Sequence, residues 1–402
     1  MARSWHFLNL YGFLINGFLF VVLFFCTDQW HRLIPTSWDI LPQAWNTFVH
    51  YVTLHMPNEP NGFFQYNPLQ QLGYFGVIFV MAPLSMLTGM AMSPALDNRF
   101  PWFPKLFGGR QAARSLHFLL LVGYLSFLVV HVSLVVVTGF IRNMNHIVTG
   151  MDDHNPIGMV IGLIAIGFVV ASWAFAHFIA WRFPREVQHL HRFLAVPFLN
   201  VLDRFQPREQ YTKEDISPFF WPNGKLPVSD EWKHLADGGL KNFQLKIGGL
   251  VEHPLSLSLD DLKHLERHEQ ISFHHCIQGW SGIAHWAGVP MSKIIELVKP
   301  LPEAKVVAFI SFGEGLYGGI YYDTQTVDNV LKAECILAYE MNYQPLTEVY
   351  GAPLRLRVEN QLGYKMVKWI ASIDFVKSEE DLGKGQGGKN EDDEYFDLLP
   401  NI

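Results

Sequence analysis

Cysteine is scarce in this chain of 402 residues, which contains only Cys26, Cys276 and Cys335. An odd number of thiols this far apart does not make a disulfide framework. Acidic residues outnumber basic ones, and the net charge is −7. That balance argues against a nucleic-acid partner. We recognise no cleavable signal pattern and no twin-arginine motif.

Charged residues are nearly absent from four windows in the first part of the chain. Each window holds about twenty or more residues, enough to cross ~30 Å of hydrocarbon as a helix. The windows are 6–26, 69–92, 115–140 and 157–181. The sequence therefore predicts an all-α four-helix transmembrane bundle over residues 1–181.

Basic residues are spread unevenly over the segments between these windows. The 93–114 loop holds four, and three arginines follow the fourth window, whereas the 27–68 and 141–156 loops hold one each. The positive-inside rule then places both ends of the bundle in the cytoplasm. We expect a multi-pass protein of the inner membrane, with its soluble half on the cytoplasmic side.

Two histidines, His117 and His131, lie inside the third window. Fourteen residues are close to four helical turns, so both imidazoles share one face, about 21 Å apart along the axis. An ionisable residue within a span is a functional hypothesis by default. This spacing favours two haems stacked across the bilayer, although each imidazole could instead hydrogen-bond a neighbouring helix.

Each haem iron would need a second axial ligand from another helix. His6 opens the first window at the level of His117, and His177 in the fourth window competes with it for that role. At the other end, His131 could pair with His55 or His50, which lie in a loop. The number of haems, one or two, stays open at this point.

Three motifs then resemble the bacterial b-type cytochromes. They are residues 5–9 (Trp-His-Phe-Leu-Asn), residues 67–74, and residues 109–118 together with His131 and Val132. The group includes cytochrome b561 and the cytochrome b subunits of thiosulfate reductase and nickel–iron hydrogenase. The resemblance covers about 1–181 and implies a bundle that holds haem b and exchanges electrons with a quinone, with His6, His117 and His131 as iron ligands.

The rest of the chain has a soluble composition. Residues 182–240 are rich in proline and predict a linker and an extended lead-in. Strand patterns at 243–247, 255–259, 306–312, 354–358 and 369–376, with short helices between them, predict an α+β domain over 241–377. The Gly-rich, acidic stretch 378–402 predicts a flexible tail.

One thiol in this half stands out. Cys276 follows a strand-like piece at 270–273 and precedes the start of an amphipathic helix at 290–297. It is either a placed thiolate or a buried apolar residue. Zinc held by His274, His275, Cys276 and His285 is a weaker alternative, because adjacent ligands on a strand point to opposite faces.

A second candidate feature is a glycine followed by two lysines, Gly363, Lys365 and Lys368. Glycine lets the backbone approach a phosphate and the ammonium groups supply charge, although lysine pairs usually line a solvated face. Tyr317 precedes two glycines on a tight turn, where a structural role is the commoner one.

Together these pieces resemble the sulfite oxidase family of molybdopterin enzymes. The matching motifs run in order over about 240–376: residues 248–254, Cys276 with 286–290, 317–319, 337–342, 351–356 and 363–369. The resemblance implies that Cys276 binds molybdenum and that Tyr317 stands on the substrate side of the metal. It also implies that the pterin and its phosphate are held by Arg355, Gly363, Lys365 and Lys368.

The sequence departs from the animal and plant sulfite oxidases just after the cysteine. Those enzymes have arginines where this chain has Gly279, Trp280 and Ser281. We therefore expect a membrane-bound molybdopterin-dependent oxidoreductase that passes electrons between the quinone pool, haem b and molybdenum and reduces a small S- or N-oxide. The alternatives are a quinone-reducing dehydrogenase of a small oxyanion such as sulfite, and a haem-only electron-transfer protein.

Overall fold

The structure is a computed structural model that describes residues 2–55, 60–202, 204–205 and 211–394. It divides into two compact units. The first comprises Met1–Ser93 and Pro104–Asn200, and the second comprises Pro94–Phe103 and Val201–Ile402. The boundary therefore falls beyond the expected end of the bundle at 181.

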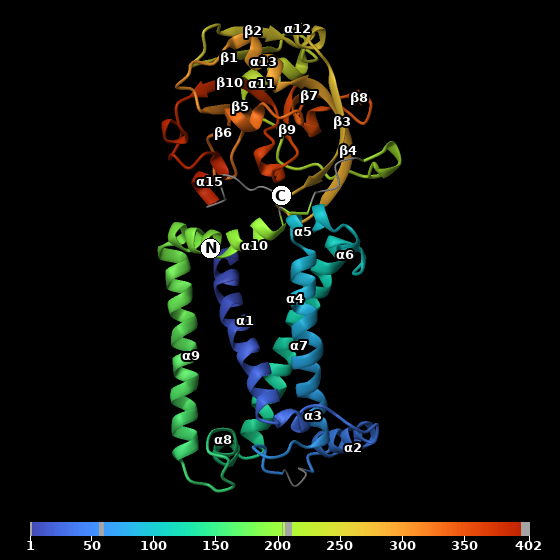
Figure 1. The fold of residues 1–402 in the computed structure, drawn as a ribbon, viewed down its shortest axis with the longest axis vertical. Coiled ribbons are helices and arrows are strands. Elements are labelled where there is room, and N and C mark those ends of the chain that lie inside the picture. The colour runs from blue at the N-terminus through green and yellow to red at the C-terminus, as the bar shows by residue number, and fades with distance from the viewer. Residues whose placement is uncertain (1, 56–59, 203, 206–210, 395–402) are drawn as a thin grey trace. The chain divides into compact units, whose positions relative to one another are not determined.

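The first unit is helical (Figure 1). The helices of residues 1–202 are, in chain order, α1 (Ala2–Cys26), α2 (Ile40–Val52), α3 (Pro68–Phe75), α4 (Ala82–Ala91), α5 (Pro94–Arg99), α6 (Trp102–Lys105), α7 (Arg110–Val137), α8 (Phe140–Val148), α9 (Ile157–Arg182) and α10 (Pro184–Leu202). Of these, the short α5 lies in the part of the chain that belongs to the second unit. A π-helical turn, η2 (Gly76–Met81), joins α3 to α4 and ends just before Pro83, which has no N–H to donate.

Four segments of the described residues are long and apolar enough to cross a membrane, which confirms the four predicted windows. They are Trp5–Cys26, Pro68–Ala91, Arg110–Val137 and Ile157–Arg182. Their large apolar side chains face outward, as Phe18 (70% exposed) and Phe168 (74% exposed) illustrate. Exposed side chains of this kind suit contact with lipid rather than water.

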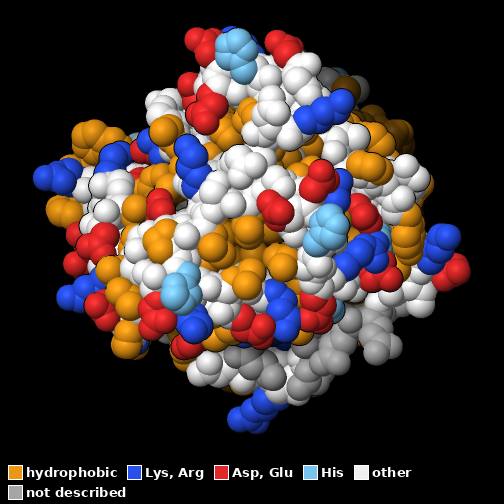
Figure 2. Space-filling view, turned by 90° about the horizontal axis from the view of Figure 1, so that it is seen from above, with side chains coloured by type: hydrophobic (Ala, Val, Ile, Leu, Met, Phe, Trp, Pro, Cys, Tyr) orange, Lys and Arg blue, Asp and Glu red, His pale blue; other side chains and the backbone are white. Residues whose placement is uncertain are grey.

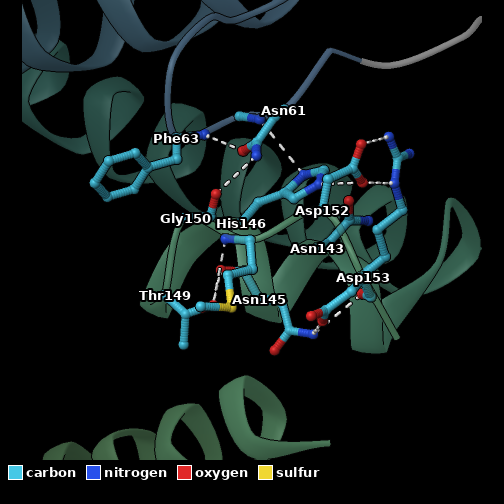
Figure 3. Close-up of polar contacts among 12 residues, drawn as sticks. Asn61, Phe63, Asn143, Asn145, His146, Thr149, Gly150, Asp152 and Asp153 are labelled. Carbon is cyan, nitrogen blue, oxygen red and sulfur yellow. Dashed lines mark hydrogen bonds and ion pairs between the residues drawn. The ribbon is translucent and has the colours of Figure 1, made fainter. Parts of the chain in front are cut away.

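The connections at one end of the bundle are tied together by polar contacts (Figure 3). His146 Nε2 lies 2.9 Å from Asp152 Oδ1, and Arg142 Nε donates to the same oxygen at 2.5 Å. These hydrogen bonds, from Arg142 first and from His146, hold the pKa of Asp152 well below its usual range. The Asn61 side chain donates to the Gly150 carbonyl at 2.9 Å, which joins the residues just before α3 to those just after α8.

The second unit is an α+β domain, as expected, with two five-stranded sheets in the orders β2-β1-β10-β5-β6 and β3-β4-β7-β8, β9 pairing with β7. The strands are β1 (Gln244–Gly249), β2 (Leu255–Ser258), β3 (His268–His275), β4 (Ser281–Pro290), β5 (Val306–Glu314), β6 (Ile320–Thr326), β7 (Cys335–Met341), β8 (Gln344–Pro345), β9 (Arg355–Val358) and β10 (Ile370–Val376). Its helices are α11 (Asp230–Asp237), α12 (Leu259–His264), α13 (Met291–Val298), α14 (Val327–Val330) and α15 (Lys389–Glu394).

Two apolar clusters form the interior of this unit. The larger includes Leu245, Phe309 and Phe375 from the first sheet, all fully buried. The smaller surrounds Cys276 and includes Phe220, Trp280 and Trp286. On the face shown in Figure 2, acidic and basic side chains are interspersed around apolar ones, as on a water-exposed surface.

Two expectations about this half are wrong. Pro184–Leu202 is a helix, α10, and not an extended lead-in, because its apolar residues recur at helical spacing and Pro184 occupies the first turn. Residues 378–394 are not a flexible tail. They contain α15, whose Glu391 is fully buried, and the remainder of the predicted tail, 395–402, lies outside the described residues.

Candidate functional site

Cys276 lies in the turn of the β3–β4 hairpin, whose last pair is His275 with Ser281. Its N–H donates to the Trp280 carbonyl at 3.0 Å, and its own carbonyl accepts from Gly279 N–H at 3.1 Å. Gly279 has a φ of +92°, which a side chain would disfavour. The turn therefore places the thiol in the smaller apolar cluster, where Cys276 is only 2% exposed.

Polar groups from distant segments reach this thiol. The Asn223 side chain donates to Cys276 Sγ at 3.4 Å. Lys368 Nζ donates to the Asn223 carbonyl and, at 3.0 Å, to the Val349 carbonyl. Burial lowers the pKa of Lys368 to about 7, with a further contribution from Arg355, while Cys276 acts in the opposite sense. Lys368 thus helps to hold Asn223 in place beside the thiol.

Two arginines from β9 lie beneath the turn. Arg355 and Arg357 are fully or nearly fully buried, and their guanidinium carbons lie 4.7 Å and 4.2 Å from the centroid of the Trp286 ring. Burial lowers the pKa of Arg355 well below its usual range, and the neighbouring Arg357 lowers it further. Arg357 pairs with Glu359 at 2.8 Å, so Arg355 is the cation with less compensation.

His274 completes the buried layer. Arg357 Nη1 lies 3.2 Å from His274 Nδ1. A guanidinium only donates, so Nδ1 accepts and the proton of the neutral ring is on Nε2. Burial lowers the pKa of His274 well below its usual value, with Arg357 the next contribution, which keeps the ring neutral.

The residues around Cys276 fit a phosphate-bearing, flat cofactor such as molybdopterin. Arg355 Nε and Trp286 Nε1 are buried without a hydrogen-bond partner in the described structure, and such donors call for an acceptor. A Cβ on Gly363 would lie 2.3 Å from His274 Cε1, so only glycine fits against that ring. Cys276 supplies a soft sulfur ligand for the metal.

Two predicted site residues are not brought to this place. Lys365 is fully buried, and its ammonium pairs with Asp323 and, at 2.8 Å, with Glu391. Burial opposes its charge, but these two carboxylates raise the pKa of Lys365. Tyr317 lies in the connection between β5 and β6 and is 71% exposed. Gly363, Arg355 and Lys368, by contrast, all lie around the thiol or its neighbours.

The three histidines of the zinc alternative do not converge. His274 contacts Arg357, His275 Nδ1 lies 3.2 Å from Ser281 Oγ, and His285 Nε2 lies 3.1 Å from Glu269. Within the described residues, no group of three or more His, Cys, Asp or Glu side chains is arranged to hold a metal ion. The geometry therefore gives the zinc alternative no support.

In the bundle, the structure brings His6 and His117 together. Their ring centroids are 6.3 Å apart, with an angle of 76° between the ring planes. With metal–imidazole bonds of about 2 Å, two imidazoles on opposite sides of one metal ion have centroids about 6 Å apart. His117 Nδ1 contacts Thr88 Oγ1 at 3.0 Å. The pair therefore fits an iron held between α1 and α7.

The other predicted ligands are placed differently. His131 Nδ1 lies 3.3 Å from the Tyr74 hydroxyl, and its ring stacks on Phe127 at 5.4 Å. In the described part of the chain, no histidine ring contacts it. His177 is exposed on α9, and His55 is exposed after α2. Among the described residues, the structure thus brings together one of the predicted pairs of histidines, His6 with His117.

Sequence reasoning missed Asn223, Arg357 and Thr88. For Arg357 a signal existed, because Arg355 and Arg357 alternate in an apolar strand and so share one face. Asn223 stands between Pro222 and Gly224, which indicates a turn and nothing about the thiol. Thr88 carries no signal, since a threonine within a helix usually bonds its own backbone.

Comparisons with known proteins agree with the two-part structure. Residues 1–150 match the family model of prokaryotic cytochrome b561, and residues 233–382 match that of the oxidoreductase molybdopterin binding domain. These matches imply haem b and molybdenum–molybdopterin as cofactors. His6, His117 and His131 lie within the first of these ranges, and Cys276, Arg355 and Lys368 lie within the second.

Individual relatives cover one part or the other. The protein-methionine-sulfoxide reductase catalytic subunit MsrP of Xanthomonas axonopodis is 33% identical over 43% of this chain and 58% of its own length. The putative protein-methionine-sulfoxide reductase subunit YedZ1 of Azospira oryzae is 32% identical over 34% of this chain and 50% of its own length. The chain thus spans little more than half of these relatives.

A third relative is covered more fully. The uncharacterized oxidoreductase YuiH of Bacillus subtilis is 32% identical over 39% of this chain and 78% of its own length. Together with the two family matches, this relative identifies the family of the chain. The chain belongs to the oxidoreductases with a molybdopterin-binding domain of the sulfite oxidase type, here fused to a bacterial cytochrome b561 bundle.

Proposed function

We propose that this chain is a membrane-bound molybdenum oxidoreductase that reduces a small S- or N-oxide with electrons from quinol. The observation that carries the proposal is a buried thiol, Cys276, with buried cations Arg355 and Lys368 nearby and no arginine in its turn. The names of the reductase relatives favour an S-oxide.

The reaction balances without a further reactant. An S-oxide, two protons and two electrons give a thioether and water, and a quinol supplies two electrons and two protons as it becomes a quinone. Molybdenum held by Cys276 would supply two-electron oxygen-atom chemistry, and haem held by His6 and His117 would supply one-electron transfer. The protein must therefore bind both cofactors and hold the substrate out of bulk water.

This chain's own residues divide these tasks. Cys276 binds the metal through sulfur. Arg355 and Lys368 hold the anionic part of the pterin by charge and hydrogen bonds, and Gly363 allows its close approach. Trp280 and Phe220, whose rings are 5.2 Å apart at the turn, exclude water. Lys365 instead stabilises the fold.

In the bundle, His6 and His117 bind one haem iron, and His131 is the ligand available for a second. The basic 93–114 loop supports a cytoplasmic position for that end of the bundle. Four spans return the chain to the side on which it started, so the soluble unit is cytoplasmic. A reporter fused after Leu202 tests this, and activity of a strictly periplasmic reporter would reverse the assignment.

The direction of electron flow is tested with the purified full chain in detergent, with haem and molybdenum measured per chain. Haem is first reduced by a short-chain quinol. Methionine sulfoxide, dimethyl sulfoxide or trimethylamine N-oxide should then reoxidise it in the wild type but not in Cys276→Ala. Reduction of oxidised haem by sulfite would favour the dehydrogenase, and haem without molybdenum would favour a haem-only carrier.

A further inference from the structure

We propose that Thr88 is a positioning residue that fixes the tautomer of His117 and raises the electron-donor strength of this haem ligand. The inference rests on the proposed binding of haem b by His6 and His117. It concerns a residue of α4 that contributes no iron ligand itself.

The hydrogen-bond geometry of Thr88 decides the direction of the contact. Thr88 is fully buried, and its hydroxyl donates to the Leu84 carbonyl at 2.7 Å. A carbonyl can only accept, and 2.7 Å is the usual length of an O–H···O bond. The single hydroxyl hydrogen is therefore used within the helix.

The hydroxyl also lies 3.1 Å from the Ser85 carbonyl, a second acceptor within the helix, so its contact with His117 must run the other way. Thr88 Oγ1 lies 3.0 Å from His117 Nδ1. With its hydrogen committed to Leu84, the oxygen accepts, and Nδ1 carries the imidazole proton. His117 Nε2 is left with a free lone pair for iron.

The same bond has an electronic consequence. A hydrogen bond from the Nδ1 proton of a ligating imidazole raises the basicity of the ligand and fixes the orientation of its ring. A more basic ligand favours ferric over ferrous iron, so Thr88 lowers the midpoint potential of this haem. His131 differs, because the Tyr74 hydroxyl can donate or accept in its contact with His131 Nδ1.

The test compares three variants of the full chain, purified in detergent with haem bound. Thr88→Val keeps the shape of the side chain and removes the hydroxyl, and Thr88→Ser keeps the hydroxyl. Ser85→Ala is a matched control, because this nearby hydroxyl contacts Tyr124 at 3.4 Å rather than His117. The readouts are haem content, the spectrum of the ligated iron and the midpoint potential.

We expect Thr88→Val to raise the midpoint potential. At a fixed ambient potential the reduced-to-oxidised ratio should rise about tenfold, which is 59 mV for one electron. Thr88→Ser and Ser85→Ala should match the wild type. An unchanged or lower potential in Thr88→Val would overturn the proposal.

Loss of haem from Thr88→Val also gives an answer. If Thr88→Ser then keeps haem at the wild-type potential, the hydroxyl is required, as proposed. If both variants lose haem, packing is the cause and the proposal is wrong. A haem content unchanged from the wild type in His117→Ala would instead show that the proposed ligation, and not the role of Thr88, has failed.

Discussion

Cys276 and His117 differ in the charge of the side chains that surround them. Cys276 has buried cations around it, Arg355 and Lys368, whose pKa values are lowered by burial. His117 is held by a neutral hydroxyl, that of Thr88, inside a lipid-facing bundle.

The difference follows from what each site is built to receive. On the proposed assignment, an anionic pterin phosphate would compensate the buried cations, which are costly to keep in the soluble unit without it. In hydrocarbon an uncompensated charge is costlier still, and a haem iron needs only neutral imidazoles.

The largest expected effect separates the two sites. Cys276→Ala should abolish S-oxide reduction and leave the haem spectrum unchanged, because the thiol is remote in sequence and family range from the haem ligands. His117→Ala should lose the His6–His117 haem and quinol-driven activity but keep bound molybdenum. Haem and molybdenum analysis of both variants checks this, and joint loss of both cofactors in either variant would refute independent sites.

Replacement of Arg355 should weaken cofactor binding without lowering the stability of the protein. Hydrogen bonds to charged groups contribute about 1.5–3 kcal/mol, so Arg355→Met should weaken pterin binding about 10- to 100-fold. The cofactor-free protein should be as stable as the wild type or more so, since an uncompensated cation is removed.

The measurements for Arg355→Met are molybdenum content after dialysis and unfolding in urea. Arg267→Met is the control, because Arg267 is half exposed and pairs with Glu269 and Glu340 on the surface. Equal molybdenum loss in the two variants would remove Arg355 from the site.

Replacement of His131, the histidine of α7 that contacts no other histidine among the described residues, should have a smaller effect. His131→Ala should leave the His6–His117 haem in place, because the two histidines are about 21 Å apart along the helix. Haem per chain measured as the pyridine complex should fall by one at most. A variant without haem would show that the two ends do not bind independently.

The smallest effect is a dependence of stability on pH. The pKa of Lys368 is about 7 in the folded protein, lowered from 10.5. Between these values the unfolded chain binds more protons, so stability of the cofactor-free protein should rise as pH increases from 7 to 10. Lys368→Met should flatten this part of the profile, followed by tryptophan fluorescence, and an unchanged slope would contradict the buried position of the amine.

Much of the fold could be predicted because its signals are local. The four spans follow from runs of apolar residues, and β1, β2, β5, β9 and β10 fall on segments predicted as strands. The strand β4 was not predicted, because Gly282, Gly288 and Pro290 interrupt its pattern. Gly288 is needed there, since a Cβ would lie 2.0 Å from the Leu337 carbonyl oxygen of β7.

The site was predictable only where spacing carries the information. Helical spacing identified His117, and a motif identified Cys276. The two lysines show the limit: η5 (Gly363–Lys365) ends at Lys365, and Trp369 has a φ of +54°. Lys368 thus lies beyond the end of that turn, outside any helix or strand, and the two ammonium groups reach different partners.

The buried pair of Lys365 with Glu391 sets an order of events during synthesis. Lys365 belongs to the segment that also carries Gly363 and Lys368, and its ammonium is costly to bury without the carboxylate from α15. This segment cannot settle until residues 389–394 have left the ribosome. The placement of Gly363 and Lys368 therefore depends on α15, a helix more than twenty residues further along the chain.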